Sequence, residues 1–275
     1  NAAFEEAIAR AVTPDTHVLD IGTGSGLLAM MAARAGARRV TACEADPHLA
    51  AAATEIVARN GLSERVTVVP KRSTQLRVGV DLAAPADVIV AEVLDVGLIG
   101  EGVLPTLRHA LAALAKPGAR VIPRGATVQA ALVALPALRR VHPIGQVRGF
   151  DLSPFDRFRN PTSALAVALE AEPHTLLSEP AAAMSFDFTV AAPRGRQATL
   201  SVTPTVDGDA HGVAFWFDLH VDDRVTVSSG PGGALRHWLQ AVIFFERDLP
   251  VRAGEAVKLA VEHSDAALSF RPLGA

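Results

Sequence analysis

Apolar and polar residues follow one spacing up to about residue 123 and another beyond it. In the first part, helical patterns alternate with short apolar runs: Phe4, Ile8 and Val12 fall on one helical face, and residues 18–21 (VLDI) have the pattern of a buried strand. Strands separated by helices predict right-handed crossovers and a parallel sheet. Residues 1–123 are therefore predicted to form one α/β domain.

The same signals predict the other elements of this domain. Further strands are predicted at residues 38–44, 66–70, 87–92 and 119–123, and further helices at 27–36, 47–61 and 104–115, the last closed by KPG at 116–118. Pro47 suits a first helical turn, and Asn60 with Gly61 suits a C-terminal cap. Ligands of parallel sheets bind beyond the carboxyl ends of the strands, so the loops after residues 21, 44 and 92 are expected to meet at one edge.

Beyond residue 123 the pattern becomes that of many short strands. Turn signals such as PRGR, DGD and PGG separate the apolar runs, which predicts an antiparallel sandwich or barrel over residues 124–275. Residues 151–182 fit this pattern poorly, and SALAVALEAE at 163–172 is predicted to be a short helix inserted between strands. The apolar runs lie at residues 126–135, 184–190, 198–206, 212–221, 224–229, 241–246 and 256–263.

Composition narrows the class of protein. With 49% hydrophobic residues the chain of 275 residues can bury a full core, and no apolar run reaches the roughly 18 residues of a membrane span. Residues 1–12 lack the order of a signal peptide, and the single cysteine, Cys43, excludes a disulfide framework. A net charge of −3 provides no basic field for nucleic acid. We therefore expect a cytoplasmic protein that binds neither membrane nor nucleic acid and holds no metal.

A glycine loop lies between the strand at 18–21 and the helix that follows. Its sequence, DIGTGSG at 20–26, has evenly spaced glycines that let the backbone turn tightly and approach a ligand, although such turns also use glycine without binding anything. Glu44, at the end of the second strand, can accept both hydroxyls of a ribose or can be a solvated strand end. Together, the loop and the acid favour a nucleoside-containing cofactor.

A second loop, AEVLDVGLIGEG at 91–102, follows the fourth strand. It carries Glu92 and Glu101 nine positions apart with nothing basic between them, and three glycines allow it to turn. These two acids either lie on the surface in contact with solvent or bind a cation. Their place at the ligand-binding edge of the sheet puts them beside the glycine loop.

The order of these motifs resembles that of the protein arginine methyltransferases. The matching segments are residues 18–37, CEAD at 43–46, PKRSTQL at 70–76, the loop at 91–105, PRGATVQAALV at 123–133 and LRHWLQAVIFFERDLPVRAGEAV at 235–257, so the resemblance covers nearly the whole chain. The loop at 91–102 is most similar to that of the monomethylating (type III) branch. The resemblance implies a Rossmann-like class I methyltransferase domain at 1–123 and a β-barrel domain at 124–275. It also implies an inserted helical arm at about 151–172 that makes a head-to-tail homodimer.

The resemblance further implies S-adenosyl-L-methionine as cofactor and S-adenosyl-L-homocysteine as product. Asp20 and the glycines of the loop would border the methionine part, Glu44 would hold the ribose, and the adenine would lie along residues 73 and 74. The full set implied to bind cofactor is Asp20, Gly22, Gly24, Gly26, Leu27, Leu28, Glu44, Ala45, Ser73, Thr74 and Glu92.

For the substrate, Glu92 and Glu101 match the family's paired glutamates, which would fork onto one guanidinium. His237 would accept a proton late in the reaction or brace its loop, and Trp238 belongs to the same pocket-closing loop. Asp95 would narrow the pocket, or it is a surface acid. Arg236 stands where the family usually has threonine; it would anchor the carboxylate of free arginine, or it too lies on the surface.

Three functions stay open at this point. We favour monomethylation of free L-arginine or a small guanidino compound by a bacterial biosynthetic enzyme. The alternatives are methylation of arginine in a peptide or protein, and a non-catalytic scaffold that keeps the fold. The number of methyl groups added, one or two, and the size of the oligomer also stay open. In the family, an N-terminal pair of helices covers the cofactor, and no such pair is represented before Asn1. We therefore expect the segment that covers the cofactor either to be disordered or to be formed by other residues.

Overall fold

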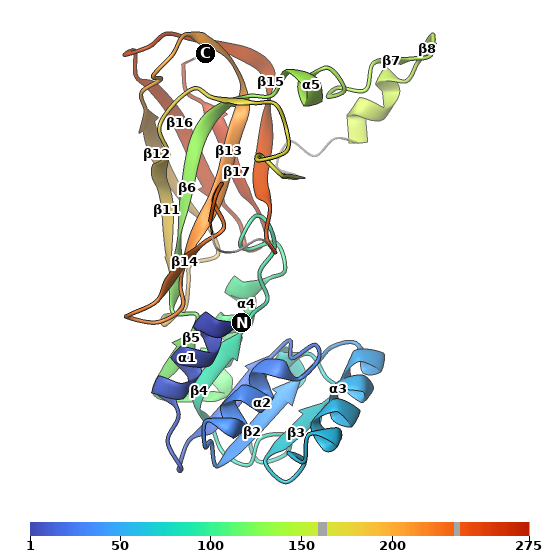
Figure 1. Cartoon of the computed structure of the whole chain (residues 1–275), viewed down its shortest axis with the longest axis vertical. Coiled ribbons are helices and arrows are strands. Elements are labelled where there is room, and N and C mark those ends of the chain that lie inside the picture. Colours follow the sequence, from blue (N-terminus) through green and yellow to red (C-terminus); the bar gives the residue numbers. More distant parts are fainter. Residues whose placement is uncertain (159–163, 234–236, 275) are drawn as a thin grey trace.

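The computed structural model describes residues 1–158, 164–233 and 237–274, and Figure 1 shows two sheet-based domains, one above the other. The N-terminal domain is built on five parallel strands in the order β3-β2-β1-β4-β5. The predicted parallel sheet is therefore confirmed. Its strands are β1 His17–Ile21, β2 Arg39–Cys43, β3 Val66–Val69, β4 Ala86–Ala91 and β5 Ala115–Ile122.

The helices between these strands begin and end close to the predicted residues. α3 starts where predicted because the Asp46 carboxylate accepts hydrogen bonds from the backbone N–H groups of His48 and Leu49, with Pro47 in the first turn. No helix in the described ranges is long and apolar enough to cross a membrane. The helices are α1 Ala2–Ala11, α2 Leu27–Arg34, α3 Pro47–Arg59, α4 Val103–Ala113 and the short 3-10 helix η1 Ser73–Gln75.

α4 ends two residues before its predicted end. The helix stops at Ala113, and residues 116–118 (KPG) belong to β5 instead of closing the helix. Ala115 pairs with Ala86 and Arg120 pairs with Val88, so β5 carries extra residues at this point and forms a bulge. Residues 116–119 have no register partner in β4, and Gly118 has a φ of 75°, so the Pro-Gly pair lies within the bulge.

The C-terminal domain is antiparallel and barrel-like, as predicted. A seven-stranded sheet has the path β10-β6-β13-β15-β9, with β11 also paired to β6 and β14 to β13, and a three-stranded sheet has the order β12-β16-β17. The chain enters this domain directly after β5, where β6 begins at Gly125. The strands are β6 Gly125–Ala134, β9 Leu165–Val167, β10 Thr175–Leu176, β11 Ala181–Asp187, β12 Arg196–Val202, β13 Gly208–His220, β14 Thr226–Ser228, β15 Gln240–Val251, β16 Val257–His263 and β17 Leu268–Pro272.

The short helix predicted at 163–172 is wrong, although residue 163 itself lies outside the described residues. Residues 165–167 form β9, in which Val167 pairs with Gln240 of β15. Val167 and Leu169 are buried there against the sheet. An unpaired sheet edge rewards an extended segment with backbone hydrogen bonds, and this tertiary contact overrides the local helix preference.

A projecting segment leaves the barrel between β6 and β9 (Figure 1). It contains the helix α5 Pro136–Arg139, the strands β7 Gln146–Val147 and β8 Phe150–Asp151, and the 3-10 helix η2 Ser153–Phe158. It begins earlier in the chain than the expected arm.

Hydrogen bonds and ion pairs hold the barrel against the first domain. The indole Nε1–H of Trp238 donates to the carbonyl oxygen of Leu94 at 2.9 Å. The Arg108 guanidinium, on α4, pairs with Asp265 at 2.6 Å, and Arg10, on α1, pairs with Asp222 at 2.7 Å. The barrel is thereby tied directly to the loop that follows β4, which carries the two glutamates.

Candidate functional site

The glycine loop leaves the carboxyl end of β1 with a backbone that only glycine adopts easily. Gly22, Gly24 and Gly26 have φ values of 72°, 53° and 80°. The N–H groups of Gly22 and Thr23 donate to the carbonyl oxygen of Cys43 at 3.0 Å, which fixes the loop at the end of β2. A Cβ atom on Gly22 would lie 2.6 Å from Val93 Cγ1, so the loop also packs tightly against the chain after β4.

Asp20 lies beneath this loop. Its side chain is buried, with 1% of the residue exposed, and it accepts a hydrogen bond of 2.5 Å from the Thr23 hydroxyl. Burial, aided by the nearby charge of Glu44, raises the pKa of Asp20 to about 6. Asp20 therefore positions the loop through Thr23, a residue that the sequence analysis did not single out; that Asp20 borders the cofactor stays a prediction.

Glu44 braces the same loop from β2. One carboxylate oxygen accepts from the N–H of Gly24 at 3.1 Å, and the other accepts from the N–H of Asp46 at 3.0 Å. Each oxygen keeps a second lone pair with which it can accept a further hydrogen bond. The side chain is thus held in place while still able to bind a pair of hydroxyls.

A cavity of about 350 Å³, here called the strand-end cavity, opens where the carboxyl ends of the parallel strands meet. Seven of the predicted site residues line it: Gly22, Glu44, Ala45, Ser73, Thr74, Glu92 and Glu101. Gly24, Gly26, Leu27 and Leu28 do not line it; the first two shape the loop, and the two leucines begin α2. The structure thus brings residues 22, 44, 73, 92 and 101 together from four separate loops.

Other lining residues were missed by the sequence analysis. Lys71 and Arg72 lie just after Pro70, which ends the run of β3, and Lys71 pairs with Asp81 at 2.6 Å. Their place at a strand end in the motif PKRSTQL was the signal that could have identified them. Cys43 also lines the cavity, and burial raises the pKa of its thiol to about 12, so it forms a neutral wall and is not an activated nucleophile.

The two glutamates both face the strand-end cavity, Glu92 directly after β4 and Glu101 just before α4. Burial, together with the charges of Glu101 and Asp20, raises the pKa of Glu92 to about 7. Burial and the charge of Asp95 also raise the pKa of Glu101, against the opposing effect of His237. Carboxylates that disfavour one another's ionisation in a half-buried cavity form a site in which a bound cation is stabilised.

The glutamate loop, residues 92–102, is held in a constrained shape. The buried Leu98 has a φ of 76°, which is unfavourable for leucine. An Asp95 carboxylate oxygen accepts from the N–H of Gly100 at 2.8 Å, and a Cβ on Gly100 would overlap that carboxylate. Asp95 therefore stabilises the conformation of the loop that carries Glu101. The expected role of Asp95 in narrowing the pocket stays a prediction.

The loop from the barrel meets the glutamate loop at Trp238. This residue is buried, and its ring contacts Phe217 edge-on at a centroid distance of 5.4 Å. Its hydrogen bond to Leu94 joins the two loops. His237 is exposed, and its ring lies 5.3 Å from that of Trp238, close enough to Glu101 for its charge to lower the pKa of that carboxyl. Arg236, expected to bind substrate, lies outside the described residues.

Comparison with known proteins identifies the family. Residues 125–273 match the model for the arginine methyltransferase oligomerization subdomain, and residues 5–131 match that for the ribosomal protein L11 methyltransferase. An arginine N(omega)-methyltransferase of Streptomyces achromogenes subsp. streptozoticus is 38% identical over 265 residues, which cover 96% of this chain and 73% of the relative. The chain belongs to the arginine methyltransferase family.

More distant relatives agree with this assignment. The protein arginine N-methyltransferase 7 of Oryza sativa subsp. indica is 33% identical over 98% of the chain, which spans 43% of that protein. The chain also superposes on one chain of the solved Trypanosoma brucei PRMT1 enzyme–prozyme heterotetrameric complex with AdoHcy. The TM-score is 0.81 over 94% of this chain and 83% of the other, at 23% identity, so this match shows the shared fold.

Proposed function

We propose that this S-adenosylmethionine-dependent arginine methyltransferase transfers one methyl group to a terminal guanidino nitrogen of free L-arginine or of a small guanidino compound. The observation that carries the proposal is the 38% identity, over 96% of the chain, to a bacterial relative named for arginine itself. The two glutamates in the strand-end cavity supply the matching chemistry.

The strand-end cavity fits a nucleoside-containing cofactor. Glycine backbone borders it at Gly22, and Glu44 keeps free lone pairs for ribose hydroxyls. Ser73 and Thr74, which line the same cavity, are proposed to lie along the adenine. The bound cofactor supplies an electrophilic methyl group on a sulfonium.

Glu92 and Glu101 are proposed to hold the guanidinium. This group is planar, stays protonated and presents five N–H donors, so two carboxylates can fork onto it and fix its plane. Positioning of this kind contributes up to roughly 7–11 kcal/mol in ideal cases, and the fixed negative charges stabilise the cation further. The methylated nitrogen must lose a proton, and His237, which lies close enough to Glu101 to affect its pKa, is the proposed acceptor in its neutral imidazole form.

Mass spectrometry of two parallel reactions tests the substrate. Each contains S-adenosylmethionine, and one receives free L-arginine while the other receives an Arg–Gly-rich peptide. The proposal expects methylarginine from the free amino acid and an unmodified peptide. Glu92→Gln and Glu101→Gln should nearly abolish turnover while calorimetry still detects cofactor binding, and near-normal rates in both variants would contradict their assignment.

Peptide or protein arginine is the second candidate substrate. It is favoured by the 33% identity, over 98% of the chain, to the rice protein arginine N-methyltransferase 7. Methylation of the peptide alone in the same experiment would select it. Absence of both products together with absence of cofactor binding would instead support a non-catalytic scaffold.

We further propose that the projecting segment forms a homodimer. Its exposed apolar side chains include Phe150, Phe155 and Phe158, which are 72%, 60% and 76% exposed. Exposed aromatic surface of this kind is typical of association sites. Light scattering should show a dimer that becomes monomeric when Phe150 and Phe155 are changed to serine. The control Val190→Ser, at an exposed barrel residue, should leave the dimer intact. If the phenylalanine double variant also keeps the mass of the dimer, the proposal is contradicted.

A further inference from the structure

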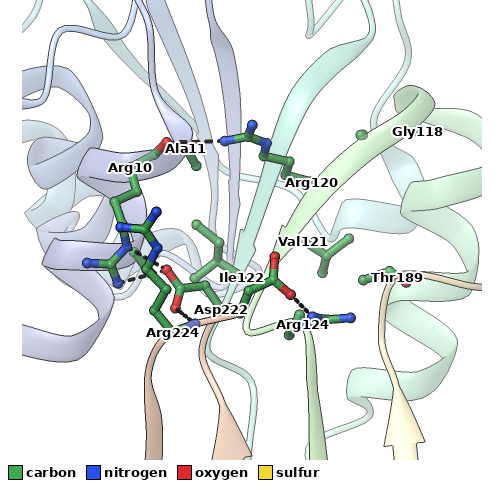
Figure 2. A pocket seen from close by; sticks show the side chains of 13 residues that line it. Arg10, Ala11, Gly118, Arg120, Val121, Ile122, Arg124, Thr189, Asp222 and Arg224 are labelled. Atoms are coloured by element: carbon green, nitrogen blue, oxygen red, sulfur yellow. Dashed lines mark hydrogen bonds and ion pairs between the residues drawn. The ribbon is translucent and has the colours of Figure 1, made fainter.

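A second cavity, here called the seam cleft, lies between the two domains and has a volume of about 680 Å³ (Figure 2). It runs along β5, one of the two edge strands of the parallel sheet, between α1 and the turn that joins β13 to β14. It shares no lining residue with the strand-end cavity. Whatever binds there is therefore separate from the methyl-transfer site.

The seam cleft concentrates positive charge. Arg10, Arg120, Arg124 and Arg224 line it from three parts of the chain, and the acids in the described lining are Asp222 and Asp223. Four guanidinium groups and two carboxylates leave a formal charge of +2 in a protein whose net charge is −3. Glu6, which faces Arg10 at 3.5 Å, is not part of the lining.

Only two of these arginines have carboxylate partners within the described residues. Arg10 pairs with Asp222 at 2.7 Å, and Arg124 pairs with Asp223. Arg120 donates to the backbone carbonyl oxygen of Arg10 at 3.1 Å. The guanidinium of Arg224 has no hydrogen-bond or ion-pair partner in the described part of the chain, and Figure 2 shows it beside Arg10 at the edge of the cleft.

We propose that the seam cleft binds the phosphate group of a small phosphate monoester. Such a group carries about −1.5 to −2 charges near pH 7, which matches the charge of the cleft, and guanidinium forks suit its oxygens. The volume of the seam cleft exceeds that of a phosphate group alone. The apolar side chains in its lining can contact the small organic group of the ester. The described lining contains no aromatic ring on which a nucleobase could stack, which favours a sugar phosphate or glycerol phosphate. The apolar side chains of the lining are Ala7, Ala11, Ala119, Val121 and Ile122.

Binding in the seam cleft has a physical consequence for the whole molecule. A phosphate held by Arg120 on β5 and by Arg224 on the β13–β14 turn would join the two domains, next to the ion pair of Arg10 with Asp222. A ligand that binds only when both domains are folded and docked raises the temperature of unfolding.

Thermal unfolding at constant ionic strength, with saturating S-adenosylhomocysteine to fill the strand-end cavity, tests the proposal. Glycerol 3-phosphate should raise Tm by about 3–6 °C at ten times its dissociation constant, while glycerol should have no effect. Inorganic phosphate is the third ligand. If inorganic phosphate binds as tightly as glycerol 3-phosphate, the site recognises the phosphate group alone. If it binds more weakly, the glycerol group contributes to binding; both results support the site.

The decisive variant is Arg120→Gln with Arg224→Gln, since neither guanidinium pairs with a carboxylate among the described residues, so the change breaks no ion pair seen there. It should lose the shift, and Arg120→Lys with Arg224→Lys should retain part of it. The matched control, Arg59→Gln with Arg271→Gln, removes two exposed arginines elsewhere and should keep the full shift. No rise in Tm with the wild-type protein, or the same rise in the double glutamine variant, would overturn the proposal.

Discussion

Replacing Glu92 with glutamine should abolish methyl transfer and yet stabilise the unliganded protein at pH 8. The folded protein resists ionisation of this carboxyl, because burial and the charges of Glu101 and Asp20 raise its pKa from 4.5 to about 7. In the unfolded chain the same carboxyl ionises freely. Ionised Glu92 therefore destabilises the unliganded folded protein. A bound guanidinium offsets this electrostatic cost, and a glutamine at this position avoids it because its amide is neutral.

The magnitude and its pH window follow from the pKa. A rise from 4.5 to about 7 is about 2.5 units, or about 3.4 kcal/mol as an upper limit. The carboxyl is only half-buried, so solvent screening reduces this to about 1–2 kcal/mol. Between these two pKa values the unfolded chain releases a proton that the folded protein retains. The wild-type protein therefore loses stability as the pH rises through this window, and above it the loss is complete.

Urea unfolding of the unliganded wild-type and Glu92→Gln proteins at pH 5 and pH 8 measures the effect. The variant should be more stable by about 1–2 kcal/mol at pH 8, with a clearly smaller difference at pH 5. Glu179→Gln, at an exposed glutamate, should show no such difference between the two pH values. A variant that is less stable than wild type at pH 8, or equally stabilised at both, would refute the reasoning.

The same structure makes four further predictions. In a methyl-transfer assay, kcat/KM should rise as the pH increases through about 7, where Glu92 ionises, and a flat profile from pH 6 to 8.5 would contradict this. Trp238→Phe should lower stability in urea by about 1–3 kcal/mol, because the buried carbonyl of Leu94 loses its donor. Gly22→Ala should weaken cofactor binding at least tenfold by calorimetry, since its φ is 72° and its new Cβ would meet Val93; unchanged affinity would show that the loop tolerates a side chain. Asp95→Ala should lower kcat about tenfold or more, whereas Asp95→Asn, which still accepts from the Gly100 N–H, should retain most of it.

Much of the fold and part of the site could be predicted from the chain alone. The helical period of residues 1–12 and the strand patterns at 18–21 and 38–44 are local patterns; the first became α1, and the other two became β1 and β2 of the parallel sheet. Because the carboxyl ends of parallel strands meet at one edge, the order of strands and loops was enough to bring Glu44 and Glu92 to one cavity.

Other features depend on contacts that no local pattern records. Residues 165–167 form a strand because β15 offers them an unpaired edge, although their composition suits a helix. Asp95 turns inward onto Gly100, where the constrained loop leaves room only for its carboxylate. The arginines of the seam cleft come from three distant parts of the chain, at residue 10, at residues 120 and 124, and at residue 224, so only the tertiary structure brings them together. Sequence determines what each segment prefers, but competition among distant segments for backbone hydrogen bonds, buried space and counter-charges decides which preferences are met.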